Sequence, residues 1–378
     1  MRPADSGVEA LAVLANPPRK LQAAFGVSRI GRVTGLDRVG VEVACAVRPR
    51  GHVLQVSNGK GWTWAQAASS ALSEAAELSA SEQVEAPELR WATEAQMRAH
   101  FGRGAVWPVA RWLEARDEAR AERVRVAWRQ ARELGTGAWV WVPAAAVHCV
   151  PPGIPSLAPI PVRWTSNGLA AHPNRAAAVR HAVFELLERE ALCRVLPDGW
   201  TRAATQRARV PASWVSRRQP RLSKKCQALQ AQGIASFHFL WPPARTGLPA
   251  SLAACLLFEA EAPNAHVAAG YACSEDPKDA LDRAFLEAAQ TRLTDIHGAR
   301  EDVAPMNRAD AQRLRSICEA ARPAASLSAG APRRRLPALA SHLRRRGVRI
   351  AIAALTRPGA GLHVVRALSP DLRLSELL

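Results

Sequence analysis

Apolar stretches along the chain predict most of its strands. Two runs near the start, VGVEVACAV (39–47) and HVLQVSNGKG (52–61), predict the first strands, with Lys60 in a tight glycine turn after the second. Further strands are expected at AWVWVPAA (138–145), ASFHFLW (235–241), LAACLLFEA (252–260), HVAAGYA (266–272), VRIAIAAL (348–355) and LHVVRAL (362–368). In VRWTSNGLAA (162–171) a strand is expected to enter a loop. A Pro-rich connector (150–161) separates the two halves of the chain.

Helical periodicity occupies the spaces between these strands. We expect helices from Thr63 to Glu82, from Arg111 to Leu134, after the cap residue Asn174, and after the cap residue Asp276. An Arg-rich helical region follows Gly298. The alternation of strands and helices predicts an α/β or α+β fold with a large mixed sheet and packed helices.

Length and composition support a globular protein with a sizeable core. The chain has 378 residues, of which 48% are hydrophobic and 22% charged. It contains neither a signal-peptide pattern nor an apolar stretch of the roughly 20 residues that a membrane helix needs. The seven dispersed cysteines match no zinc-binding spacing and no disulfide framework. These features predict a cytoplasmic protein that does not interact with membranes.

The positive charge is concentrated near the end of the chain. Lys+Arg 51 against Asp+Glu 33 gives a net charge of +18, and eleven arginines but two acids lie between Arg308 and Arg349. That segment has no aromatic residue for stacking on bases, so nucleic-acid binding is the most distant of the functional hypotheses. The segment is either a solvated surface or a basic face that attracts ATP or an acidic peptide.

Three predicted helices place polar side chains at the same i, i+4, i+7 spacing, which puts each set on one helix face. Small or apolar residues flank each set, a pattern that differs from that of a freely solvated helix. The sets are Ser70, Glu74 and Glu77; His181, Glu185 and Glu188; and Arg283, Glu287 and Gln290. Each helix alone is compatible with surface salt bridges, but three matching helices favour a common site.

A group of five carboxylates requires positive charge to compensate it. Magnesium prefers hard oxygen ligands and is usually held by carboxylates together with nucleotide phosphates. The sequence has no Walker A motif, kinase glycine-rich loop or GxGxxG motif. The pattern therefore predicts a magnesium–nucleotide site built from helix side chains.

Four stretches of the sequence closely resemble the YcaO family. They are SRIGRVTGLDRVGVEVACAVRP (28–49), SNGKGWTWAQAASSALSEAAE (57–77), TSNGLAAHPNRAAAVRHAVFELLERE (165–190) and DPKDALDRAFLEAAQTRLTDIHGARED (276–302). The resemblance implies one domain over residues 1–378. It has a short N-terminal segment (1–27), a nucleotide-binding core (28–305), and an Arg-rich helical region with closing strands (306–378).

The resemblance also implies roles for individual residues. Glu74, Glu77, Glu185, Glu188 and Glu287 would hold Mg²⁺ on the phosphates of ATP, and Ser70, Asn167, Arg189 and Arg283 would contact the nucleotide. Arg283, Glu287 and Gln290 would form the catalytic group. The chain departs from the family pattern at Leu78, His172 and Glu190, and the basic contact near its start falls to Arg19 or Lys20.

The implied activity is ATP-dependent activation of backbone amides in a ribosomally made precursor peptide. The product is a thioamide if sulfide is the nucleophile and an azoline if a Cys, Ser or Thr side chain is; the chain's end, ALSPDLRLSELL, favours the thioamide. A separate recognition protein or TfuA-like partner is expected, and the chain is expected to form a homodimer. An accessory protein that binds nucleotide and scaffolds a partner enzyme is the alternative.

Overall fold

The computed structural model describes most of the chain between Arg19 and Arg373. The described residues are 19–84, 88–113, 118–151, 156–160, 162, 164–259, 267–298, 306–324, 327, 331–357 and 359–373. Most of the expected N-terminal segment, parts of the Pro-rich connector and the last five residues lie outside them. Within these residues no helix has both the length and the apolar character needed to cross a membrane.

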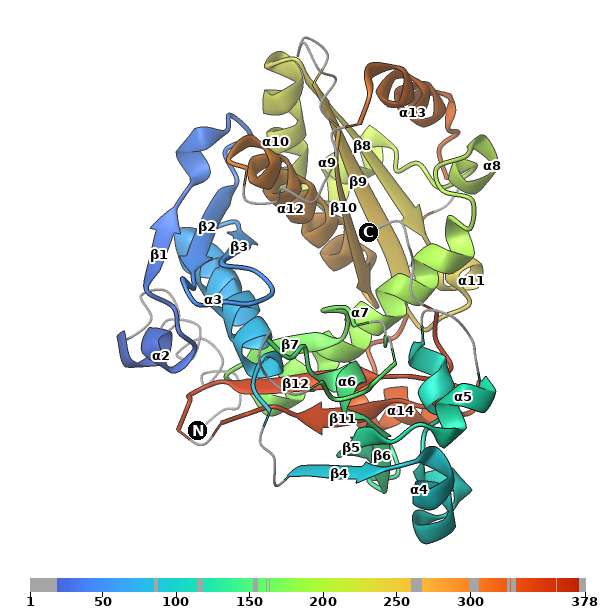
Figure 1. Cartoon of the computed structure of the whole chain (residues 1–378). Helices are drawn as coiled ribbons and strands as arrows, with labels where there is room; N and C mark the ends of the chain where they lie inside the picture. The colour runs from blue at the N-terminus through green and yellow to red at the C-terminus, as the bar shows by residue number, and fades with distance from the viewer. Residues whose placement is uncertain are drawn as a thin grey trace, which may run out of the picture.

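A three-stranded antiparallel sheet and one helix form the first unit of the fold. Strands β1 (Arg29–Arg32), β2 (Glu42–Val47) and β3 (Val56–Gly61) pair in that order, and helix α3 (Trp64–Ser81) follows β3 (Figure 1). The hydroxyl of Thr63 caps α3 by accepting a hydrogen bond from the backbone N–H of Gln66. The helix predicted over residues 63–82 is therefore confirmed.

The second half of the chain contains a unit with the same arrangement. Strands β8 (Ile234–Trp241), β9 (Ser251–Glu259) and β10 (Val267–Ser274) pair antiparallel in the order β10-β9-β8, and helix α12 (Pro277–Ile296) follows β10. The Asp276 side chain caps α12, with Pro277 at the first helical position, as the sequence predicted. The three strands predicted here are also confirmed.

Each unit has a glycine where its last strand approaches its helix most closely. A Cβ atom on Gly59 would lie 2.0 Å from the backbone nitrogen of Ala71 on α3. A Cβ atom on Gly270 would lie 2.2 Å from the backbone nitrogen of Ala288 on α12. Because backbone meets backbone at both positions, no side chain fits there. These contacts fix how α3 and α12 are seated on their sheets.

A six-stranded antiparallel sheet forms the third part of the fold. Its main path has the order β4-β5-β11-β12-β7, and β6 pairs with β5 outside that path. Its strands are β4 (Leu89–Ala92), β5 (Val126–Glu133), β6 (Trp139–Pro143), β7 (Leu169–His172), β11 (Ala351–Ala354) and β12 (His363–Leu368). The two closing strands of the chain thus lie between strands from its first half.

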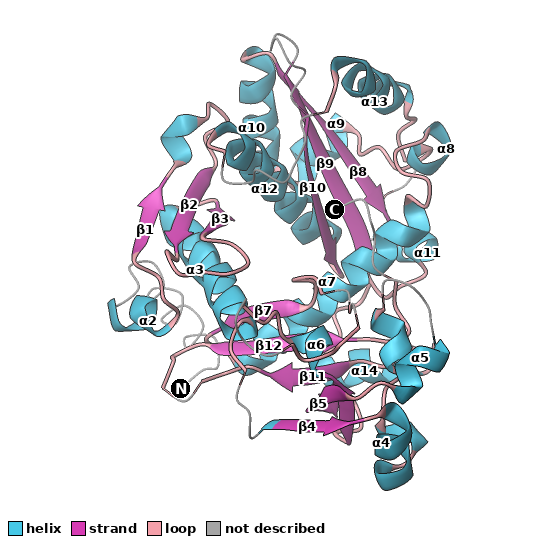
Figure 2. Cartoon of the chain, in the orientation of Figure 1, coloured by secondary structure: helices cyan, strands magenta, loops and turns pink. Residues whose placement is uncertain are grey.

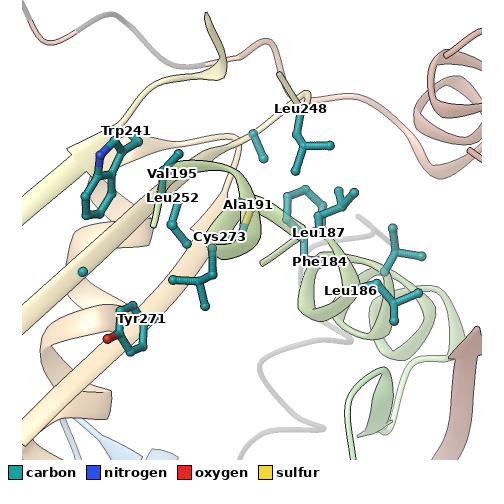
Figure 3. Packing of buried hydrophobic residues seen from close by; sticks show 14 of the residues in the cluster. Phe184, Leu186, Leu187, Ala191, Val195, Trp241, Leu248, Leu252, Tyr271 and Cys273 are labelled. Carbon is teal, nitrogen blue, oxygen red and sulfur yellow. The ribbon is translucent and has the colours of Figure 1, made fainter. Parts of the chain in front are cut away.

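Helix α7 (Arg175–Val195) packs between the six-stranded sheet and the β8–β10 sheet. On one side it contacts a cluster that includes Ile352 and Val365, and on the other it faces β9 and β10. Figure 3 shows Leu187, Ala191 and Val195 of α7 in the same cluster as Leu252, Tyr271 and Cys273. This position explains why α7 is apolar around most of its circumference.

The remaining helices cover the outside of the three sheets. They are α2 (Arg19–Ala24), α4 (Glu94–Phe101), α5 (Glu118–Arg123), α6 (Ala144–Val147), α8 (Arg202–Thr205), α9 (Ala212–Arg218), α10 (Pro220–Ala231), α11 (Pro243–Thr246), α13 (Arg308–Ala320) and α14 (Leu336–Arg344). Short 3₁₀ turns occur at Thr34–Leu36, Arg103–Ala105 and Val109–Trp112.

The structure corrects three sequence predictions. The helix expected over residues 111–134 is wrong, because residues 126–133 form strand β5, whose Ala127 and Ala131 are buried while Gln130 and Arg132 are exposed (Figure 2). The α+β class is confirmed, but the ladders between named strands form three antiparallel sheets in place of one large mixed sheet. Lys60 lies within strand β3, not in a turn.

Candidate functional site

Helices α3, α7 and α12 lie around the centre of the view in Figure 1. Burial raises the pKa of Glu77, and the charges of Glu185 and Glu74 raise it further. Burial also raises the pKa of Glu185 and of Glu188, and in both cases the charge of Glu287 adds to the effect. The five carboxylates of the predicted site therefore lie within one another's electrostatic field.

Edge strands supply backbone hydrogen bonds to three of these carboxylates. On β7, the backbone N–H of Ala171 donates to Oε1 of Glu77 at 2.8 Å; just before that strand, the N–H of Gly168 donates to Glu185 Oε2 at 3.1 Å. On β10, the N–H of Cys273 donates to Glu188 Oε2 at 3.2 Å. Strands β7 and β10 both lie at the edges of their sheets, so their outward N–H groups are available to side chains.

Basic side chains from three elements surround the carboxylates. Nζ of Lys60 on β3 lies 3.2 Å from Oε2 of Glu287 on α12. Arg283, one helical turn before Glu287, lies 3.9 Å from Asp279, and its charge also acts on Glu188. The charge of Arg189 lowers the pKa of both Glu185 and Glu188 and so opposes the effect of burial. The site therefore combines crowded negative charge with partial compensation.

His181 lies on the same face of α7 as Glu185. The protein atoms around the imidazole and the charges of Arg283 and Lys60 lower its pKa. The imidazole is therefore neutral at physiological pH. A neutral imidazole near Arg283 and Lys60 acts as a hydrogen-bonding group and not as an additional cation.

Three other predicted residues carry buried polar atoms that lack a hydrogen-bond partner within the described part of the chain. These atoms without a partner are both amide atoms of Asn167, Nε of Arg189 and Oε1 of Gln290. Ser70 is half-buried on α3, one turn before Glu74. Unsatisfied buried donors and acceptors are costly unless water or a ligand completes them. Their presence around the carboxylates fits a site that is completed by a polar ligand.

The donor set also fits magnesium held jointly by protein and phosphate. Among the described residues, no three His, Cys, Asp or Glu side chains converge closely enough to hold a metal ion by themselves. Mg²⁺ is commonly bound by one or two carboxylates, with water and phosphate oxygens completing its octahedral shell. Carboxylates distributed over three helices suit ions that are held together with a nucleotide.

The site contains two basic residues that the sequence prediction did not include. Lys60 has a recognisable signal, since it stands between the two glycines at the end of β3. Arg366 on β12 has no comparable signal. It is 4% exposed, Nε and Nη1 lack partners in the described residues, and burial lowers its pKa to about 10 while the charge of Glu185 acts in the opposite direction.

Two of the three departures from the family pattern have structural explanations. Leu78 is buried in α3, where its side chain contributes to the apolar side of the helix. Glu190 is buried and accepts hydrogen bonds from Nε of Arg194 and from the backbone N–H of Arg373, both at 2.7 Å. Glu190 thus attaches the end of the described chain to α7. Arg19 and Lys20 lie exposed at the start of α2.

Comparison with protein families supports the resemblance seen in the sequence. A family model described as YcaO cyclodehydratase, ATP- and Mg²⁺-binding, matches residues 58–373. The chain belongs to the YcaO family. It is therefore a member of a family that binds ATP and Mg²⁺. The matched region contains every predicted site residue apart from the basic contact assigned to Arg19 or Lys20.

Curated relatives share about three tenths of the sequence. A Rhizobium leguminosarum bv. trifolii protein, uncharacterized and encoded in the tfuA 3' region, is 30% identical over 314 residues, which cover 78% of this chain and 70% of that protein. An uncharacterized protein of Methanothermobacter thermautotrophicus is 29% identical over 312 residues, covering 78% of this chain and 73% of that protein.

Solved structures share the fold at lower sequence identity. A heterocyclase in complex with substrate and cofactor has a TM-score of 0.72 at 18% identity, covering 98% of this chain; this chain spans 52% of the heterocyclase chain. The YcaO protein of Methanopyrus kandleri with AMPPCP and Mg²⁺ has a TM-score of 0.69 at 20% identity, covering 97% and 91% of the two chains. The E. coli microcin synthetase McbBCD with pro-MccB17 has a TM-score of 0.65 at 14% identity, covering 91% and 88%.

Proposed function

We propose that this chain uses MgATP to activate backbone amides of a substrate peptide. The observation that carries the proposal is the grouping of five carboxylates from α3, α7 and α12 with Lys60, Arg189 and Arg283 around unsatisfied polar atoms. Membership of an ATP- and Mg²⁺-binding family supports the same assignment. Charged helices that meet in the fold interior provide what a polyphosphate requires: cations for its oxygens and carboxylates for its metal ions.

Each predicted residue has a role in this proposal. Glu74, Glu77, Glu185, Glu188 and Glu287 would hold Mg²⁺, which when bound neutralises charge on the phosphate oxygens. Ser70, Asn167, Arg189 and Arg283 would orient the nucleotide. Arg283, Glu287 and Gln290 share one face of α12 and would face the phosphoryl group that is transferred.

The reaction proceeds through an activated amide oxygen. A nucleophile adds to the carbonyl carbon, and the resulting oxyanion attacks the terminal phosphorus of ATP as ADP leaves. Phosphate then departs with the former amide oxygen. The solved relatives named as a heterocyclase and as a microcin synthetase with its bound precursor support a peptide as the substrate of this fold.

We further propose the thioamide branch, assisted by a TfuA-like partner. The relative encoded beside tfuA supports such a partner. Hydrosulfide arrives as an anion, whereas an intramolecular Cys, Ser or Thr nucleophile loses a proton during attack and benefits from a positioned base. Residues 374–378, which belong to the terminal stretch that favours the thioamide, lie outside the described structure. A homodimer remains a prediction.

Mass spectrometry of a candidate precursor peptide tests the proposal. The peptide is incubated with ATP and Mg²⁺, with and without sulfide and the partner. A mass increase that matches replacement of oxygen by sulfur supports the thioamide branch. Loss of water without a sulfide requirement shows the azoline branch instead. Nucleotide binding without any peptide modification supports an accessory scaffold, and salt-dependent DNA binding without nucleotide binding would support the nucleic-acid hypothesis.

A further inference from the structure

A second concave surface lies on the outer part of the six-stranded sheet. A cavity of about 640 Å³ opens between β4, β5, β6, β11 and the first residue of α7. We call it the arginine groove and define it by the lining residues Arg90, Arg132, Trp139, Trp141, Arg175 and Ile352. None of the predicted nucleotide-site residues lines it.

The groove lies on the face of the sheet that carries Ile352. Ile352 on β11 belongs to the hydrophobic cluster that includes residues of α7, but Gln130 and Arg132 on β5 and Trp139 on β6 are exposed. On these strands, Arg132 pairs with Trp139 and Gln130 pairs with Trp141, so the four side chains share one face. Trp139 is 51% exposed, which is unusual for so large an apolar side chain.

Aromatic rings lie against two of the three arginines that define the groove. The guanidinium of Arg132 lies 3.8 Å above the Trp139 ring, and that of Arg90 lies 4.9 Å above the Phe101 ring. Within the described part of the chain, Arg90, Arg132 and Arg175 form no ion pair with a carboxylate. Arg129, by contrast, lies 2.8 Å from Glu88 at the edge of the groove. Two stacked arginines and the exposed Arg175, beside an exposed indole, suit an anionic ligand with an apolar group.

We propose that the arginine groove binds an acidic, extended segment of the substrate peptide at a distance from the reacting amide. Carboxylates of the segment pair with Arg90, Arg132 and Arg175, and one of its apolar side chains packs on Trp139. This proposal rests on the proposed function of the nucleotide site.

One helix connects the groove to the nucleotide site. Arg175 begins α7, and Glu185 lies ten residues further along the same helix. At 1.5 Å of rise per residue this separation is about 15 Å, which about five residues of extended peptide span. Holding one part of the peptide in the groove raises the local concentration of the amide at the nucleotide site.

The groove favours a peptide over a single-stranded nucleic acid. Sites for single strands use a series of aromatic side chains along a basic track, whereas this cavity has one largely exposed indole and one half-buried one.

Fluorescence anisotropy with a short labelled peptide of alternating glutamate and phenylalanine tests the groove directly. Trp139→Ala and Arg132→Gln are each expected to weaken binding of this peptide by about tenfold, since exposed aromatic and arginine anchors dominate such contacts. Arg175→Gln, at the start of α7, tests the third arginine of the groove in the same binding assay. Arg313→Gln on the exposed side of α13 is the matched control and is expected to bind the peptide like the wild type.

Three results would overturn the proposal. Equal peptide affinity of the wild type and the groove variants would show that the peptide binds elsewhere. An equal loss in Arg313→Gln would show diffuse attraction to a basic surface. A single-stranded DNA oligomer with the same dependence on Trp139 would assign the groove to nucleic acid.

Nucleotide binding is measured separately with Mg²⁺ and a non-hydrolysable ATP analogue. The groove variants are expected to retain wild-type nucleotide affinity. If the wild type binds the peptide but not the nucleotide, the proposed function fails while the groove assignment stands. If it binds the nucleotide but the groove variants bind peptide normally, the groove assignment alone fails.

Discussion

Lys60 on β3 and Glu287 on α12 form an ion pair, with 3.2 Å between Nζ and Oε2, although 227 residues separate them in the sequence. The pair joins the first unit of the fold to the second at the point where the acidic helix faces meet. It also places an ammonium group inside the cluster of carboxylates. If Glu287 holds Mg²⁺ as proposed, this ammonium group would be available to a phosphate oxygen.

Replacing Lys60 by glutamine is expected to weaken binding of MgATP analogues about tenfold, because a cation beside the phosphates is lost. Lys60→Arg is expected to restore most of the affinity. Both partners are more than a quarter exposed, so the loss of folding stability is expected to stay below about 1 kcal/mol. Titration calorimetry and denaturant unfolding measure the two quantities. Unchanged nucleotide affinity in Lys60→Gln would limit Lys60 to a structural role.

Glu185→Gln and Glu188→Gln are each expected to reduce nucleotide turnover by at least about a hundredfold, because each removes a ligand charge without changing the shape of the side chain. The thermal stability of the metal-free protein is expected to rise, since one of several mutually repelling carboxylates is removed. Glu319→Gln on the exposed surface of α13 is the control. Unchanged magnesium-dependent turnover in the double variant would contradict the site assignment.

The crowded carboxylates also predict a pH dependence of stability in the absence of metal and nucleotide. Burial and the charge of Glu287 raise the pKa of Glu188 from 4.5 to about 8. The folded protein therefore binds the proton more tightly than the unfolded chain, and stability falls as pH rises between these values. Glu188→Gln is expected to gain stability relative to the wild type over this range.

Stability is compared as the difference in unfolding free energy between the wild type and Glu188→Gln at each pH. Buried neutral histidines such as His148 and His238, whose pKa values burial lowers, change stability in the opposite direction below pH 6.5. Their contribution is the same in both proteins and cancels. A difference in unfolding free energy that does not vary with pH would show that Glu188 ionises normally in the folded chain.

Arg283→Lys keeps the positive charge on α12 but loses the planar guanidinium. If Arg283 forms paired hydrogen bonds to a phosphate group, the KM for ATP is expected to rise about tenfold. Steady-state kinetics at saturating peptide measure it. Arg315→Lys, on the exposed surface of α13, serves as the control, and identical kinetics for wild type and Arg283→Lys would place Arg283 outside the nucleotide pocket.

Gly270→Ala is expected to destabilise the fold by about 3 kcal/mol or more, because the new Cβ would lie 2.2 Å from the backbone nitrogen of Ala288. Gly59→Ala is expected to behave in the same way against α3. Gly104→Ala is the control, since nothing lies within 4 Å of the Cβ it would add. Denaturant unfolding measures all three, and equal midpoints would contradict the close strand–helix packing.

Local sequence was sufficient to predict the helices that carry the site. Cap residues such as Asn174 and Asp276 start their helices where expected, and the i, i+4, i+7 spacing places Glu185 and Glu188 on one face of α7. These features depend on residues a few positions apart, which is the range over which helical periodicity operates. The strands β8 to β10 were predictable for the same reason, because their apolar runs are continuous.

The same reasoning failed where long-range pairing decides the structure. Residues 126–133 carry a mixed Arg and Glu pattern that suits an exposed helix, yet they pair with β4, β6 and β11. Pairing with β11, more than 200 residues away along the chain, as between Arg132 and Ile352, leaves no local signal. Burial of Ala127 and Ala131 in that sheet outweighs the weaker helical preference of the segment.

The sequence alone determined which residues share a helix face, and the tertiary structure decided which faces meet. Edge-strand N–H groups from Ala171 and Cys273 bind Glu77 and Glu188, and Arg366 lies beneath the site, although none of these contacts has a sequence motif. Side-chain spacing is a local property of the backbone helix. The approach of α3, α7 and α12 depends on how three sheets pack, which only the folded chain sets.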